Sequence, residues 1–178
     1  MSLYPLHKFI VSSVLVLFVC TCGASAKTTI ESLRVKKAIT GWQEQKDSYQ
    51  YFSPQKLFEI INGGAPQYIQ QGLVDGIHQQ LTSDSGKIIE IFAEDFATPQ
   101  HAMAMAMVKK EDLGAGSPVL PLDSATVSFA VPAIGATTVV CLANHYYVEM
   151  VFSGFTNQDK LLAEARKFIA FYNTVGKK

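Results

Sequence analysis

Cysteine is scarce in this chain, and most of it lies in a segment that we expect to be removed. Only three of the 178 residues are cysteine, and two of them precede residue 27. Lys8, an almost wholly apolar run at residues 9–19 and the small residues Ala24-Ser25-Ala26 are typical of a secretory signal peptide. Cleavage after Ala26 leaves Cys141 alone, which excludes an internal disulfide. We therefore predict a periplasmic or secreted protein.

Two other interpretations of the N-terminus are open. A lipid could be attached at Cys20 or Cys22, although Val19 and Thr21 precede them where a lipoprotein signal has a small residue. The segment could also stay uncleaved as an anchor, although its apolar run is shorter than the ~20 residues that span a membrane. We expect simple cleavage, no stable membrane span afterwards, and a single domain over residues 27–178.

The sequence also lacks an excess of either charge and the common catalytic motifs. Lys and Arg number 15, and so do Asp and Glu. Without a basic field, a nucleic-acid partner is excluded. The G-x-S-x-G, H-E-x-x-H, Walker and dinucleotide motifs are absent. We expect an exported, non-catalytic binding or accessory domain whose partner is an unknown small molecule or protein and whose cofactor is unknown.

What is present predicts an α+β fold, with a single antiparallel sheet of about five or six strands packed with three helices. The tight turns between consecutive strands imply antiparallel pairing. We expect strands at about 76–82, 87–95, 125–131, 137–143 and 146–153, a weaker one near Gly41-Trp42, and helices at 54–72, 98–110 and 158–174. Residues 111–124 form a long loop with two glycines and two prolines, which is either a lid or a connection.

The middle of the first predicted helix, in the stretch "LFEIINGGAPQYIQQG" at 57–72, contains glycine and proline, which disfavour helical structure. Pro66 has no N–H and disfavours the α conformation of Ala65, so we predict a kink or break there. Gly64 lies on the apolar side of the helix, where it would let the backbone approach the sheet closely. The break frees the carbonyl group of Asn62, which makes this segment a candidate ligand site.

The same stretch resembles the motif of a family of secreted bacterial proteins of unknown function, Leu-Tyr-x-x-Ile-Asn-Gly-Gly-Ala-Glu-x-Tyr. The matching residues are Leu57, Ile61, Asn62, Gly63, Gly64, Ala65 and Tyr68. Phe58 replaces the usual Tyr and Pro66 the usual Glu, which implies a continuous helix in other members. The order of elements is also similar to that of PsbP-like domains, which implies partner or ligand binding rather than catalysis.

Six residues are candidates for ligand binding: Asn62, Gly63, Gly64, Tyr68, Glu90 and His145. Glu90 lies in a predicted strand, and there we expect Ile89 and Ile91 to face the core and Glu90 to face solvent. A buried Glu90 would instead have a raised pKa. His145 lies in a predicted turn between two strands. An unrecognised hydrolase built around Glu90 or His145 is one alternative function.

A second alternative function rests on the run "HAMAMAM" at 101–107. Its candidate metal ligands are His101, Met103, Met105 and Met107. Thioether and imidazole groups suit Cu(I), so the run is compatible with a periplasmic copper-handling protein. On a helix, however, only residues four apart would meet, and methionine also fills irregular space in cores. We favour packing over copper binding.

Overall fold

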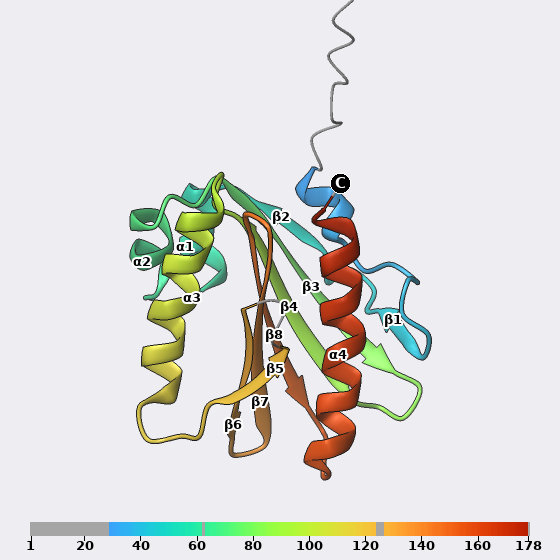
Figure 1. Cartoon of the computed structure of the whole chain (residues 1–178). Coiled ribbons are helices and arrows are strands. Elements are labelled where there is room, and N and C mark those ends of the chain that lie inside the picture. The colour runs from blue at the N-terminus through green and yellow to red at the C-terminus, as the bar shows by residue number, and fades with distance from the viewer. Residues whose placement is uncertain (1–28, 62, 124–126, 178) are drawn as a thin grey trace, which may run out of the picture.

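A computed structural model describes residues 29–61, 63–123 and 127–177 of the chain. Figure 1 shows a curved antiparallel sheet with helices on both sides. The strands are β1 (Trp42–Glu44), β2 (Gln50–Phe52), β3 (Asp75–Ser83), β4 (Ile88–Asp95), β5 (Leu120–Asp123), β6 (Ser128–Ala133), β7 (Ala136–Ala143) and β8 (Tyr146–Ser153). The helices are η1 (Ile30–Leu33, 3-10), α1 (Pro54–Ile60), α2 (Ala65–Gln70), α3 (Pro99–Gly114) and α4 (Gln158–Val175).

The predicted fold class is confirmed, and the sheet has more strands than expected. Its order is β1-β3-β4-β8-β7-β6-β5, with β2 also paired to β3, which makes eight strands. The additions are β2 and β5, two short strands without clear alternation. β5 and the last turns of α3 occupy much of the predicted loop 111–124, so the connection between them is shorter than expected. The predicted cleavage site lies outside the described residues.

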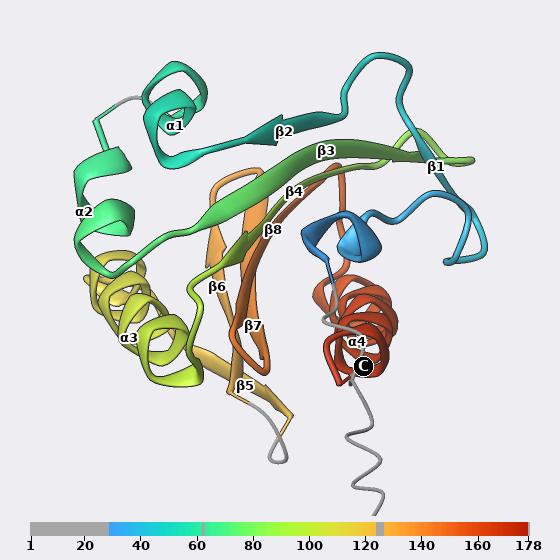
Figure 2. The same cartoon turned by 90° about the horizontal axis from the view of Figure 1, so that it is seen from above.

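The two faces of the sheet are covered by different helices, as Figure 2 shows. α4 and η1 pack on one face, where Leu161, Ala165, Phe168 and Tyr172 of α4 are buried. α1, α2 and α3 pack on the other face. Cys141 is a free, buried cysteine, and burial raises the pKa of its thiol to about 12. None of the helices in the described part of the chain has the length and apolar character that a membrane crossing requires.

The predicted break in the first helix is confirmed, and the glycines and the proline mark its position. α1 ends at an extended Ile61, and Gly63 follows with φ of +78°, a conformation that favours glycine. Gly64 is then the N-cap of α2, and Pro66 lies in the first turn, where no N–H is needed. A Cβ on Gly64 would meet Ile61 and Tyr68 at ordinary distances and no sheet atom. The predicted close approach of Gly64 to the sheet is therefore wrong.

Candidate functional site

Two acidic residues lie on the sheet face that α1, α2 and α3 cover. Side chains alternate along a strand, so Glu94 of β4 and Glu149 of β8 share this face with Tyr147. The register pairs Glu94 with Tyr147 and Phe92 with Glu149, which makes the two acids diagonal neighbours. β4 and β8 are inner strands, and the helices above them leave Glu94 1% and Glu149 8% exposed. Carboxyl groups rarely have such positions without a partner.

Glu149 is the centre of a hydrogen-bond network. The Tyr147 hydroxyl donates to its Oε2 at 2.9 Å, and the Tyr68 hydroxyl donates to the same atom at 3.3 Å. Lys109 Nζ lies 3.0 Å from Oε1, and the Lys109 side chain is 21% exposed. A carboxylate has about four acceptor sites, so Glu149 can accept from all three donors. We call Tyr68, Glu94, Lys109, Tyr147 and Glu149 the Glu149 cluster.

The second acid of the cluster is less well satisfied. Glu94 Oε2 is buried and has no hydrogen-bond partner among the described residues. Burial raises the pKa of Glu94 well above its ordinary value, and the nearby charge of Glu149 raises it further, while Lys109 lowers it. Burial and Glu149 also raise the pKa values of Tyr68 and Tyr147. Both phenols therefore remain proton donors, and burial favours the neutral form of Glu94.

The cluster brings together four elements that the chain separates widely. Tyr68 comes from α2, Lys109 from α3, Glu94 from β4, and Tyr147 and Glu149 from β8. Lys109 follows Ala102 and Met105 at helical spacing, on the side of α3 that faces the sheet. The arrangement can hold one positive charge against two carboxyl groups. Within the described residues it includes no serine, cysteine or histidine that would act as a nucleophile or a base.

Of the predicted ligand-binding residues, Tyr68 belongs to the cluster, and Gly63 and Gly64 lie in the link that leads to it. Asn62 lies outside the described residues. Glu90 pairs with His78, whose Nε2 is 2.9 Å from Oε1. The Glu90 side chain is 44% exposed, while Ile89 and Ile91 are buried, so the expected orientation of this strand is confirmed.

His145 lies at the turn between β7 and β8. Its ring is 4.1 Å from that of Tyr146, measured between centroids, and its Nε2 is 3.7 Å from Asp95 Oδ1. Tyr146 belongs to the opposite face of the sheet from the Glu149 cluster. Glu90 and His145 therefore belong to two other local pairs.

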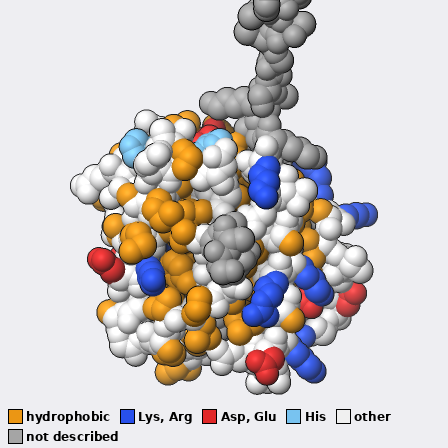
Figure 3. Space-filling view, viewed as in Figure 1, with side chains coloured by type: hydrophobic (Ala, Val, Ile, Leu, Met, Phe, Trp, Pro, Cys, Tyr) orange, Lys and Arg blue, Asp and Glu red, His pale blue; other side chains and the backbone are white. Residues whose placement is uncertain are grey.

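The candidate copper ligands lie on different sides of α3. Met105 is completely buried in the core, whereas Met103 and Met107 are exposed. Figure 3 shows hydrophobic side chains gathered on the side of the molecule where α3 lies. His101 is exposed and lies against Gly72, where a Cβ would be 3.0 Å from its Nδ1. Among the described residues, no group of three or more His, Cys, Asp and Glu side chains could hold a metal ion.

Sequence reasoning missed Glu94, Lys109, Tyr147 and Glu149. A signal was present in "EIFAED" and "YYVEM", where strict alternation places an acid on the same face as an aromatic residue. That signal becomes specific only if helices cover both faces and if β4 and β8 are neighbours. The pairing of β4 with β8 crosses more than 50 residues of chain and has no local signature.

Comparison with known proteins supports the fold alone. No protein-family model and no curated protein matches the chain. Among solved structures, the extracellular domain of PknH from Mycobacterium tuberculosis is similar, with a TM-score of 0.56 and 13% sequence identity. The match covers 83% of this chain and 95% of that domain. At this identity the likeness extends to the arrangement of helices and strands.

Proposed function

We propose that this chain is an exported, non-catalytic binding domain, and that its ligand presents a cationic group to the Glu149 cluster. The ligand is a small molecule or a protein side chain that carries an ammonium or guanidinium group. The signal-peptide features of residues 1–26 and the occurrence of a similar fold in an extracellular domain support export. The lack of a serine, cysteine or histidine in the cluster favours binding over hydrolysis.

One observation carries the proposal: Glu94 has a buried carboxyl oxygen without a partner beside a carboxylate that already binds a cation. Burying a polar group without a hydrogen bond costs about 1–3 kcal/mol. Strongly perturbed acids of this kind concentrate at functional sites. A second or better-placed positive charge would satisfy Glu94, and the site as folded offers only Lys109.

Lys109 occupies the position that we assign to the ligand. Its four-carbon chain is flexible and its side chain is 21% exposed, so it can leave when a ligand cation takes its place. The ligand cation would then contact Glu149 Oε1 directly and donate a further hydrogen bond to Glu94 Oε2. Simple amines would bind weakly because they compete with Lys109.

The test compares cationic and neutral probes of one shape on the mature chain. n-Butylammonium and n-butylguanidinium should raise the melting temperature, and n-butanol should not. At ten times the dissociation constant, a ligand adds about 1.4 kcal/mol of stability. For a domain of this size that is a shift of about 3–6 °C.

Two matched variants decide where the probes bind. Glu149→Gln should abolish the shift, whereas Glu90→Gln, on the same sheet face but outside the cluster, should retain it. Equal shifts with butanol, or a shift that survives Glu149→Gln, would contradict the proposal.

A further inference from the structure

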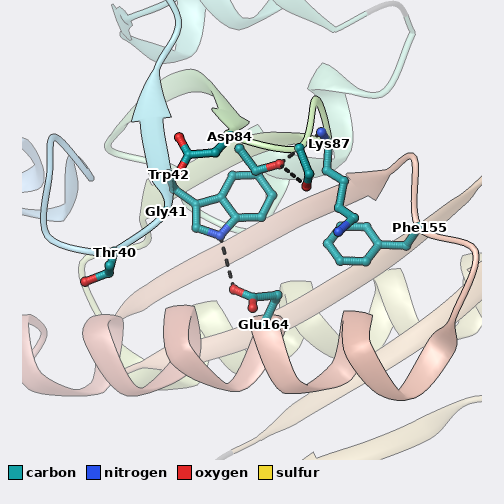
Figure 4. Close-up of a pocket in the computed structure, with 9 residues that line it drawn as sticks. Thr40, Gly41, Trp42, Asp84, Lys87, Phe155 and Glu164 are labelled. Carbon is teal, nitrogen blue, oxygen red and sulfur yellow. Dashed lines mark hydrogen bonds between the residues drawn. The ribbon is translucent and has the colours of Figure 1, made fainter.

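An open cavity of about 230 Å³ lies on the α4 side of the sheet, across the sheet from the Glu149 cluster. Figure 4 shows its walls: the Trp42 indole above, Glu164 of α4 below, and Phe155 with Lys87 at one side. Asp84, in the turn between β3 and β4, also lines the cavity. These residues come from four separate parts of the chain, so only the fold assembles them.

The acidic wall of this cavity is fixed in place and charged. Trp42 Nε1 donates to Glu164 Oε2 at 3.1 Å, and Lys167 Nζ lies 2.8 Å from Oε1. Partial burial opposes ionisation of Glu164, but these two donors and the charge of Lys87 outweigh it and lower the pKa. A carboxylate has about four acceptor sites, so Glu164 can accept further hydrogen bonds from a bound molecule.

The opposite wall supplies donors over an aromatic ring. Lys87 Nζ lies 4.8 Å from the centroid of the Phe155 ring. No ion pair links Lys87 to a carboxylate in the part of the chain that the structure describes. The Lys87 backbone is fixed because its N–H donates to Ser83 Oγ at 3.0 Å. The ammonium group lies at the cavity over the Phe155 ring, with its N–H donors available.

We propose that this cavity binds a single saccharide ring. A sugar presents hydroxyl groups that donate to Glu164 and Asp84 and accept from Lys87, and its C–H face suits the electron-rich face of an aromatic ring. Sites for drug-sized ligands have volumes of about 300–1,000 Å³. The volume of this cavity is slightly smaller, which matches one saccharide ring rather than an oligosaccharide. A phosphate group would be repelled by Glu164 and Asp84. An apolar ligand would leave Glu164 and Lys87 desolvated without partners.

Trp42 makes the test direct because it is the single tryptophan of the chain. Its fluorescence emission therefore reports on this cavity, without a contribution from a second tryptophan. We would titrate the mature chain with the methyl glycosides of glucose, galactose, mannose and N-acetylglucosamine, with linear sorbitol as the matched polyol without a ring. At least one glycoside should change the Trp42 emission saturably, in the millimolar range, and sorbitol should not.

Variants then distinguish binding in this cavity from a non-specific effect of the glycoside on Trp42 emission. Phe155→Leu keeps an apolar side chain but removes the ring face, and Lys87→Met removes the donors. Each should weaken the titration at least about tenfold, a factor that corresponds to about 1.4 kcal/mol. Phe58→Leu and Lys56→Met, two changes on α1 across the sheet, should leave the titration unchanged.

Saturation-transfer NMR of the same glycosides provides a second readout that does not depend on Trp42 emission. Urea unfolding of each variant shows whether it folds. No saturable signal by either method, or equal binding by Phe155→Leu and the parent, would overturn the proposal. Binding of sorbitol as tight as that of the glycosides would also overturn it, because the ring would then be irrelevant.

Discussion

Replacing Tyr147 with Phe removes one hydroxyl group and tests whether the Glu149 network stabilises the fold. The Tyr147 hydroxyl donates to Glu149 Oε2 at 2.9 Å, and both side chains are buried. A hydrogen bond to a charged group contributes about 1.5–3 kcal/mol. Glu149 keeps two other donors after the change, so we expect a loss of about 2 kcal/mol in the free energy of unfolding. That loss lowers the melting temperature by about 4–8 °C.

Two matched substitutions make the expectation an ordered series. Tyr68→Phe removes a longer bond of 3.3 Å to the same oxygen and should cost about 1 kcal/mol. Tyr51→Phe removes an exposed bond of 3.2 Å to Asp75 and should change stability by less than about 0.5 kcal/mol. The order of losses should therefore be Tyr147, then Tyr68, then Tyr51.

Urea unfolding followed by the emission of buried Trp42 measures these differences. A double-mutant cycle of Tyr147→Phe with Glu149→Gln should give a coupling energy of about 0.5–3 kcal/mol. A Tyr147→Phe variant within about 0.5 kcal/mol of the parent would refute the reasoning, because surface changes have effects of that size. So would a Tyr51→Phe variant that loses as much as Tyr147→Phe.

Three further predictions concern Glu94 and the link between α1 and α2. The folded pKa of Glu94 is raised, so its contribution to stability is present below the unfolded value of 4.5 and is lost as pH rises through the folded value. In urea unfolding, the free energy of unfolding of Glu94→Gln should therefore rise relative to that of the parent over this pH range. Parallel plots of the two free energies against pH would contradict this. Gly63→Ala should lower the stability by about 1–2 kcal/mol because the φ of Gly63 is +78°, whereas Gly64→Ala should be neutral or stabilising by up to about 1 kcal/mol. Thermal unfolding of both variants measures this difference. Pro66→Glu should leave the break between α1 and α2 in place, because Ile61 and Gly63 have non-helical backbone conformations. NMR chemical shifts typical of a helix at Ile61 in this variant would contradict the prediction.

Local chemistry was enough to predict most of the elements. Pro54 after Ser53, Thr98-Pro99 and Asn157 mark the starts of α1, α3 and α4, and the structure places those helices there. The turn at 83–86 joins β3 to β4 as expected. These features depend on residues near one another in the sequence, which propensity and periodicity describe well.

The candidate site depends on contacts that no local pattern contains. Glu90 attracted attention because its neighbours on the strand are apolar, yet Glu94, four residues later on the same face, is the buried acid. The difference is what lies above each: α2 and α3 cover Glu94, and the Glu90 side chain is partly exposed. Which helix covers which part of a sheet is a tertiary property, so we expected solvent on this face of the strand and missed the buried acid.

The most direct test of the cation site is chemical rescue of Lys109→Ala. This change removes the resident ammonium and leaves space of the shape of a propyl chain beside Glu149, because alanine keeps the first side-chain carbon. We would measure the binding of n-propylammonium to the variant by calorimetry, with n-propanol and the variant Lys109→Ala/Glu149→Gln as controls. We predict that n-propylammonium binds Lys109→Ala more tightly than the parent, restores its melting temperature, and releases protons as Glu94 ionises. Binding that is equal for n-propanol, or that persists without the Glu149 carboxylate, would contradict the proposed cation site.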